Sequence, residues 1–397
     1  MTLTSNIELH ESENNSFLVK HKSTHKYVKM GAREAEYLKF LMGDRDIDAV
    51  NSEYSGDLNE EEQLYLLQKF KEWGFLDQEG HPINTEEPEG RERRWTLNWR
   101  TNDITTIKFL SVNPDQWLTA SLPLIRKLVH PAAITLYTLL ILFSGILILT
   151  DPEATTLLKL EKLTLPGYLG IYLMVLVTTA IHEIAHGMVC KYYGGRVNQM
   201  GMMLFYFSPA MFCDVSDTYV FKRKRQKLAV LFAGIFSQWI MSAAAVLIYS
   251  LFRHNGVNLP LLFYYAIANL GLSMINMIPL VKLDGYWMLS HGLGIVNLRT
   301  KAFRTFYQWV NPWSKNRNGG NEQKQMKAQG QLERAILLIY GSAAVLFTPL
   351  FWCWGLYSIQ KRLDTLLGDI SLLITAGIAC VLLYHMTKFI RLINKPA

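Results

Sequence analysis

Cysteine and charge are both scarce in this chain. Only four of its 397 residues are cysteine, namely Cys190, Cys213, Cys353 and Cys380, and no two of them form a CxxC pair. A disulfide framework is therefore not expected. Charged residues make up 18% of the chain and hydrophobic residues 50%. A soluble domain rarely combines such a composition with several apolar runs of membrane length, so the composition favours a membrane protein.

The apolar runs are long enough to cross a bilayer, which takes about 20 residues of helix. Six such runs occur, at about residues 131–150, 167–190, 227–252, 261–280, 334–358 and 369–388. The N-terminus is polar and acidic, so we expect no cleaved signal peptide and take the first run as the insertion signal. The sequence predicts a mainly α-helical, polytopic membrane protein.

The basic residues predict an orientation in the membrane. Lys and Arg gather before the first run, after the second and fourth runs, and at the C-terminus, whereas the loop after the first run contains Asp151, Glu153 and Glu161. Cytoplasmic loops hold an excess of Lys and Arg, so we predict that both termini are cytoplasmic. The helix over 167–190 then ends towards the cytoplasm.

The second apolar run contains His-Glu-Ile-Ala-His at residues 182–186. Residues four apart share one face of a helix, so His182 and His186 can hold one zinc ion, and Glu183 beside them can act as general base on water. Such residues in a membrane-length helix are costly unless they have a function. The soluble metzincin pattern HExxHxxGxxH does not fit, because Val and Tyr fill the positions of its Gly and third His.

A second motif, from Asn276 to Gly285, ends the fourth run with the sequence Asn-Met-Ile-Pro-Leu-Val-Lys-Leu-Asp-Gly. The pair HExxH and NxxPxxxLDG resembles the site-2 protease family of intramembrane zinc metalloproteases, over roughly residues 125–300. The resemblance implies that Asp284 is the third ligand of a catalytic Zn²⁺. It also implies that Asn276 and Pro279 bind substrate, with Asn276 counted among the catalytic residues. Many relatives have Pro and a second Gly where this chain has Val281 and Tyr286.

The segment after the zinc helix offers an alternative ligand. Cys213 and Asp214 follow an apolar, hairpin-like stretch at residues 199–213. We expect this stretch to be partly inserted and to shield the site, because irregular backbone at membrane depth must face protein or a water-filled cavity. With three ligands already assigned, Cys213 or Asp214 is the less favoured choice.

The N-terminal residues 1–85 predict a small α+β, winged-helix-like domain. Phe17–Val19 and Tyr27–Val28 indicate a hairpin, and residues 32–41 and 59–73 indicate helices, with another short helix near 44–54. The later helix should bury Leu64, Leu67 and Phe70, with Asn59 as its cap. This order, with the ending Trp-Gly-Phe-Leu, resembles the PqqD-like domains that bind leader peptides.

That resemblance implies a peptide added as a strand along the Phe17–Val19 edge, or bound in the groove of the later helix. The alternative is a DNA-binding winged helix. The helix is rich in glutamate, which is unfavourable next to phosphates, so no nucleic-acid partner is expected.

The predicted domains follow from these segments. They are a peptide-recognition domain at 1–85, a linker and interfacial segment at 86–130, a catalytic membrane core at 131–300, a basic cytoplasmic loop at 301–333, and a C-terminal transmembrane pair and tail at 334–397.

Three functions remain open at this stage. The first is a zinc endopeptidase in a bacterial inner or plasma membrane that cleaves a ribosomally made precursor peptide near the cytoplasmic face, with a peptide exporter as a further partner. The second is cleavage of a membrane-anchored regulator within its span. The third is a non-catalytic peptide-binding subunit of an export or immunity system. The complete set of His182, Glu183, His186 and Asp284 favours an enzyme.

Overall fold

The computed structural model divides the chain into two compact units, Met1–Leu270 and Gly271–Ala397. The residues that it describes are 2–3, 7–12, 16–21, 27–42, 56, 58, 60–73, 75–77, 100–103, 106–151, 164–205, 208–295, 297–310, 330–368 and 370–393. The helix expected near 44–54, the cap expected at Asn59, residues 86–99 of the expected linker and residues 311–329 of the expected basic loop lie outside these residues.

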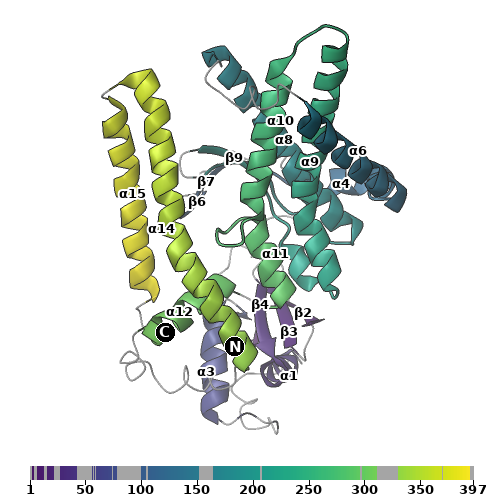
Figure 1. The fold of residues 1–397 in the computed structure, drawn as a ribbon. Helices are drawn as coiled ribbons and strands as arrows, with labels where there is room; N and C mark the ends of the chain where they lie inside the picture. The colour runs from purple at the N-terminus through teal and green to yellow at the C-terminus, as the bar shows by residue number, and fades with distance from the viewer. Residues whose placement is uncertain are drawn as a thin grey trace. The chain divides into compact units, whose positions relative to one another are not determined.

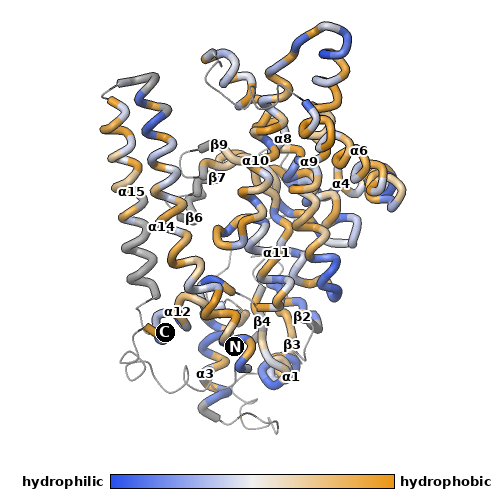
Figure 2. Tube along the Cα trace, in the orientation of Figure 1, coloured by the Kyte–Doolittle hydropathy of each residue, from blue (hydrophilic) through white to orange (hydrophobic). Residues whose placement is uncertain are grey.

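Among the residues that the structure describes, five helices are long and apolar enough to cross a membrane. They are α6 (Pro131–Thr150), α8 (Leu165–Tyr192), α9 (Lys224–His254), α10 (Pro260–Met277) and α14 (Gln331–Leu367), and Figures 1 and 2 show their course and their apolar colouring. The first five predicted runs are therefore confirmed as apolar helices. The last run forms α15 (Ile370–Ile393), whose apolar stretch is Ile370–Val381 among the described residues. The sixth crossing and the orientation stay predictions.

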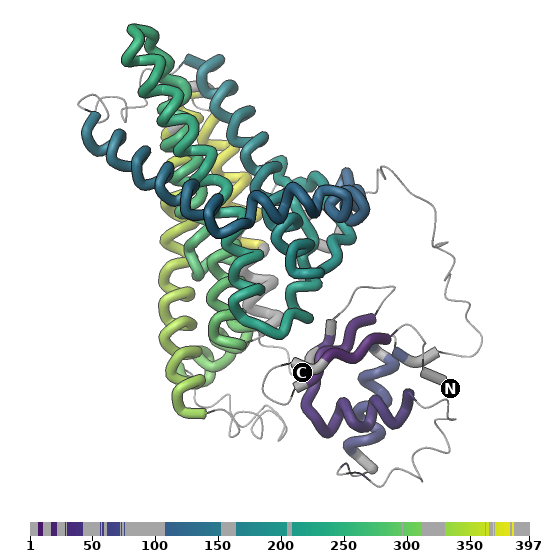
Figure 3. Tube along the Cα trace, turned by 90° about the vertical axis from the view of Figure 1, so that its right-hand side faces the viewer, coloured from purple at the N-terminus to yellow at the C-terminus, as the bar shows by residue number. Residues whose placement is uncertain are grey.

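The described part of the N-terminal region is a small α+β body (Figure 3). Its elements are the strands β2 (Ile7–Ser12), β3 (Ser16–His21) and β4 (Tyr27–Gly31), the helices α1 (Ala32–Leu41) and α3 (Glu60–Trp73), and the short pair β1 (Thr2–Leu3) and β5 (Leu76–Asp77). The predicted hairpin is confirmed as β3 and β4. A polytopic membrane protein with a small α+β domain is thus the observed fold class.

Two expectations for this body are wrong. The strand β3 lies between β2 and β4, so both of its edges are already paired and Phe17–Val19 offers no free edge. The sequence did not predict β2, which covers one edge of β3. In α3, Phe70 is buried and Leu67 packs against the core as predicted, but Leu64 is 68% exposed and Leu66 is buried instead. Gln63 is also buried, and its side-chain amide donates to the carbonyl of Leu58.

The structure contains a second, four-stranded sheet, which the sequence did not predict. Its antiparallel order is β6-β7-β8-β9, formed by Arg100–Asp103, Thr106–Val112, Met200–Phe205 and Ser208–Cys213. The hairpin-like stretch expected over 199–213 is thus the pair β8 and β9, extended by β7. The rest of the expected interfacial segment forms the helices α4 (Asp115–Ala120) and α5 (Leu122–Leu128).

Asp115 ties the start of α4 to the end of the long helix α8. Its carboxylate lies 2.8 Å from the ammonium of Lys191 and accepts a hydrogen bond of 3.0 Å from the backbone N–H of Val197. A charge-assisted bond that is partly buried holds its geometry better than an exposed one. The end of α8 is therefore fixed from outside the helix.

In the unit Gly271–Ala397, α11 (Asp284–Leu293) and α12 (Leu298–Val310) pack with α14. Tyr286 is 2% exposed and lies in the core of this unit, together with Leu298 and Leu337. The residue that replaces the second Gly of related motifs therefore packs inside the protein. Residues 301–310 of the expected basic loop are helical, because they continue α12.

Candidate metal centre

The two motif histidines share one face of α8. His182 and His186 are 3% and 4% exposed, and their Nε2 atoms lie 3.0 Å apart. The two rings meet almost at right angles, with an interplanar angle of 86°. The regular helix over Leu165–Tyr192 produces this pairing, since side chains four residues apart stand one turn above each other.

The proton position on His186 follows from its neighbour on α9. Its Nδ1 lies 2.7 Å from the backbone carbonyl oxygen of Val230. A carbonyl oxygen only accepts hydrogen bonds, so Nδ1 must be the donor. In the neutral imidazole the other nitrogen, Nε2, then presents a lone pair.

His182 is held in the same tautomer by a side chain. Its Nδ1 lies 3.1 Å from Oε1 of Gln238, and the amide nitrogen of Gln238 donates to Oδ1 of Asn269 at 3.2 Å. With the amide oxygen facing the ring, Nδ1 is again the donor. The Nε2 of His182 therefore also presents a lone pair towards its partner.

Two lone pairs 3.0 Å apart repel each other unless a cation lies beside both. Imidazole nitrogens bind zinc at about 2.0–2.1 Å, and at a tetrahedral angle two such nitrogens stand about 3.3 Å apart. The observed spacing is close to this value. Each ring also donates its other N–H to a protein oxygen, as metal-binding histidines almost always do. The donor set thus fits a zinc ion on chemical grounds.

Gly234 on α9 lies directly against the two histidine rings. A Cβ atom at this position would lie 2.4 Å from Nε2 of His186 and 2.5 Å from Nε2 of His182. Real Cβ contacts are never that short, so a larger residue would intrude on both nitrogens. Glycine at position 234 therefore allows α9 to pack this closely against the two histidine rings.

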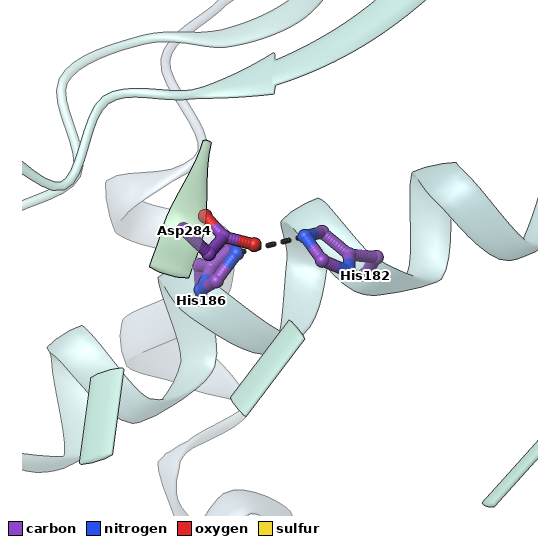
Figure 4. A group of neighbouring side chains, drawn as sticks. All are labelled: His182, His186 and Asp284. Atoms are coloured by element: carbon purple, nitrogen blue, oxygen red, sulfur yellow. Dashed lines mark hydrogen bonds between the residues drawn. The ribbon is translucent and has the colours of Figure 1, made fainter. Parts of the chain in front are cut away.

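Asp284 is the first residue of α11 and follows Leu283 in extended conformation. The ligand atoms of His182, His186 and Asp284 all lie within 4.8 Å of one another, and Figure 4 shows the three side chains converging. Gly285 permits the approach of α11 to the end of α10, because a Cβ there would lie 2.2 Å from the backbone oxygen of Met277.

Glu183, in α8, lies near enough to Cys213, at the end of β9, for its charge to act on the thiol. Glu183 is half-buried. Burial raises the pKa of the Cys213 thiol well above its ordinary value, and the nearby charge of Glu183 raises this pKa further. Cys213 is therefore held as a neutral thiol, and it does not belong to the group of three ligand atoms among the described residues.

The structure also describes the other residues singled out in the sequence. Asn276 is in the last turn of α10 and is half-buried, while the carbonyl of Pro279 accepts a hydrogen bond of 2.9 Å from Tyr340. Asp214 accepts from the backbone N–H of Ser216, which makes it part of a local turn. Asp217 accepts from the backbone N–H of residue 196.

Sequence reasoning missed Gln238 and Asn269, which are 3% and 0% exposed. A signal was present, because both are amides inside apolar runs of membrane length, where a polar side chain needs a partner. Gly234 and Gln238 are four residues apart and thus occupy one face of α9, which is the face that meets α8.

The comparisons with known proteins are sparse. No family model matches the chain, and no solved structure matches it. The chain is 27% identical over 120 residues to a Bacillus subtilis protein named "Putative peptide zinc metalloprotease protein YydH". The matched part is 30% of this chain and 46% of that protein, so it spans less than half of the relative's length. This distant similarity to a protein named as a zinc metalloprotease is consistent with the zinc-fitting donor set described above.

Proposed function

We propose that this protein is a membrane-embedded zinc metalloendopeptidase of the site-2 protease type. The observation that supports this most strongly is the pair of Nε2 lone pairs on His182 and His186, which lie 3.0 Å apart in one group with the carboxylate of Asp284. Asp284 completes the usual set of three protein ligands, which leaves one position for water or substrate. A structural zinc site would be closed by a fourth protein ligand, and the group has three among the described residues.

Each residue then has a chemical role. A zinc ion, when bound, would lower the pKa of water and polarise the scissile carbonyl. Glu183 takes the proton from the attacking water and later returns it to the leaving amine. The Nδ1–H groups of His182 and His186 continue to donate hydrogen bonds to Gln238 and Val230, which fixes both rings while the reaction proceeds.

The substrate must reach the site as an extended strand, because a helical amide is protected by its own hydrogen bonds. Asn276 has the side-chain amide to pair with such a strand, at the end of α10. It lies seven residues after Asn269 and so shares that residue's face of the helix. We therefore give Asn276 the role of substrate binding.

We further propose that the substrate is a precursor peptide captured by the N-terminal body. A groove of about 460 Å³ lies beside α3, and its lining includes Met30, Tyr65, Lys69 and Trp73. This groove replaces the Phe17–Val19 edge as the capture site, since that edge is covered on both sides. A tethered capture site raises the concentration of substrate near the catalytic residues.

The test separates the base from the ligands. Purified Glu183→Gln should bind one zinc ion with an affinity like that of the wild type but lose proteolysis by at least a thousandfold, because the amide cannot accept the proton. Asp284→Ala should lose zinc as well as activity, while Asp214→Ala, a matched loss of one carboxylate, should keep both. Cleavage by Glu183→Gln at near wild-type rate would refute the assignment of the base, and full zinc occupancy in Asp284→Ala would refute the ligand set.

A further inference from the structure

A chain of buried amide hydrogen bonds runs from α10 through α9 to the first histidine. Asn269 is 0% exposed, Gln238 3% and Ser242 6%. These residues lie in helices long and apolar enough to cross a membrane. In hydrocarbon there is no water to satisfy a misplaced amide, so the direction of each bond in this chain is energetically important.

The direction is fixed at one end by the main chain. Nδ2 of Asn269 lies 2.9 Å from the backbone carbonyl oxygen of Gln238 and 2.9 Å from the hydroxyl of Ser242. A backbone carbonyl cannot donate, so this end of the Asn269 side chain must be its nitrogen. The oxygen of Asn269 is then at the other end, where it accepts from the side-chain nitrogen of Gln238 at 3.2 Å.

The same logic passes along Gln238. Once its amide nitrogen is committed to Asn269, its amide oxygen is turned towards Nδ1 of His182, at 3.1 Å. This oxygen requires a proton on Nδ1. If the amide of Gln238 turned over, an NH₂ group would face Nδ1, and the proton of the ring would move to Nε2, where it would block metal binding.

We propose that Asn269 acts as a positioning residue for the metal centre, setting through Gln238 which nitrogen of His182 presents its lone pair. His186 needs no such device, because its partner is a backbone carbonyl whose polarity is invariant. The side-chain relay makes His182 the ligand that is sensitive to residues outside the centre. This inference rests on the proposed zinc site and adds a residue that does not touch the histidine.

The test measures zinc affinity of the full-length protein in detergent, by competition with a chromophoric chelator. Gln238→Met keeps the length of the side chain but removes the acceptor. Asn269→Leu removes the anchor that orients Gln238. Each should weaken zinc binding about 10- to 100-fold, as loss of such outer partners does in other metal sites. The zinc affinity of the double variant should lie within about threefold of that of the weaker-binding single variant, because both substitutions act through one bond to His182.

Two further variants separate this role from general packing. Gln238→Glu should recover most of the affinity that Gln238→Met loses, since a carboxylate oxygen also accepts from Nδ1–H. Tyr265→Phe removes the hydroxyl that pairs with Thr178, a buried polar link between α10 and α8 one turn before His182. It should change zinc affinity by less than twofold.

The outcomes are distinct. Wild-type affinity in Asn269→Leu, additive losses in the double variant, or an equal loss in Tyr265→Phe would each overturn the relay. Absence of zinc binding in the wild-type protein would instead refute the proposed function. Retained zinc binding in the wild type, with coupled losses in the two relay variants, would establish Asn269 as a positioning residue.

Discussion

Replacing Gly234 by alanine tests the centre with a single methyl group. The added Cβ would lie 2.4 Å from Nε2 of His186 and 2.5 Å from Nε2 of His182, about 1 Å short of the 3.4 Å at which ordinary contact begins. Neither ring can simply swing away, because Nδ1 of each is bonded to α9, at Val230 and Gln238. The methyl group therefore displaces a ring or the ion.

The size of the effect follows from the tolerance of metal coordination. Ligand distances in zinc sites vary by about 0.2 Å, so a displacement of about 1 Å removes at least one good bond. We expect zinc affinity to fall at least about 100-fold, which corresponds to about 2.8 kcal/mol. The apo-protein should also lose some stability, because the clash is with the rings themselves and overpacking costs about 1–3 kcal/mol, partly offset by the advantage of about 1 kcal/mol that alanine has over glycine in a helix.

The assay is zinc competition together with thermal unfolding of the apo-protein in detergent. Gly271→Ala is the matched control, since it lies within α10 and a Cβ there meets nothing within 4 Å. It should leave zinc affinity unchanged. If Gly234→Ala bound zinc within threefold of the wild type, the close packing of α9 would not fix the two histidine rings for metal binding, and the reasoning would be refuted.

Two more predictions concern the flanks of the site. Gly285→Ala should lower activity at least tenfold by moving Asp284, since the new Cβ would lie 2.2 Å from the Met277 carbonyl oxygen. Gly292→Ala in the same helix, where a Cβ meets nothing within 4 Å, should have no effect on activity. Equal rates in both variants would contradict this prediction. Tyr65→Asp in the α3 groove should raise the KM for a full-length precursor at least fivefold and leave cleavage of a short core peptide unchanged. Leu64→Asp, at an exposed position of the same helix outside the groove lining, should alter neither. A change in the cleavage of both substrates by Tyr65→Asp would contradict the capture role.

The membrane helices and the ligand candidates were predictable because their signals are local. An apolar run of about 20 residues identifies its own helix. The spacing of His182 and His186 likewise implies one face of that helix without any knowledge of its neighbours. Asp284 was reached through the resemblance of a second motif, and the structure places its carboxylate in one group with the two histidines.

The second sheet could not be predicted because its pairing is not local. Lys108 on β7 faces Met203 on β8, and the sequence between them contains two membrane-length helices. The alternating pattern of each strand is short, and neither strand identifies its partner. The N-terminal sheet failed in the same way, since the missed strand β2 decides that Phe17 is in a central strand and not at an edge.

The relay through Gln238 shows why the sequence alone did not reveal the residues that support the histidines. Burying an amide without partners in hydrocarbon costs several kcal/mol, so every polar group near the histidines needs a bond for stability alone. Here the bonds that satisfy Asn269 and Gln238 also place the proton on the ring of His182. Stability and metal binding therefore impose the same requirement on these side chains. A variant that satisfies the amides differently would fold and still lose the metal, and this is why zinc affinity, measured separately from stability, is the decisive quantity for this centre.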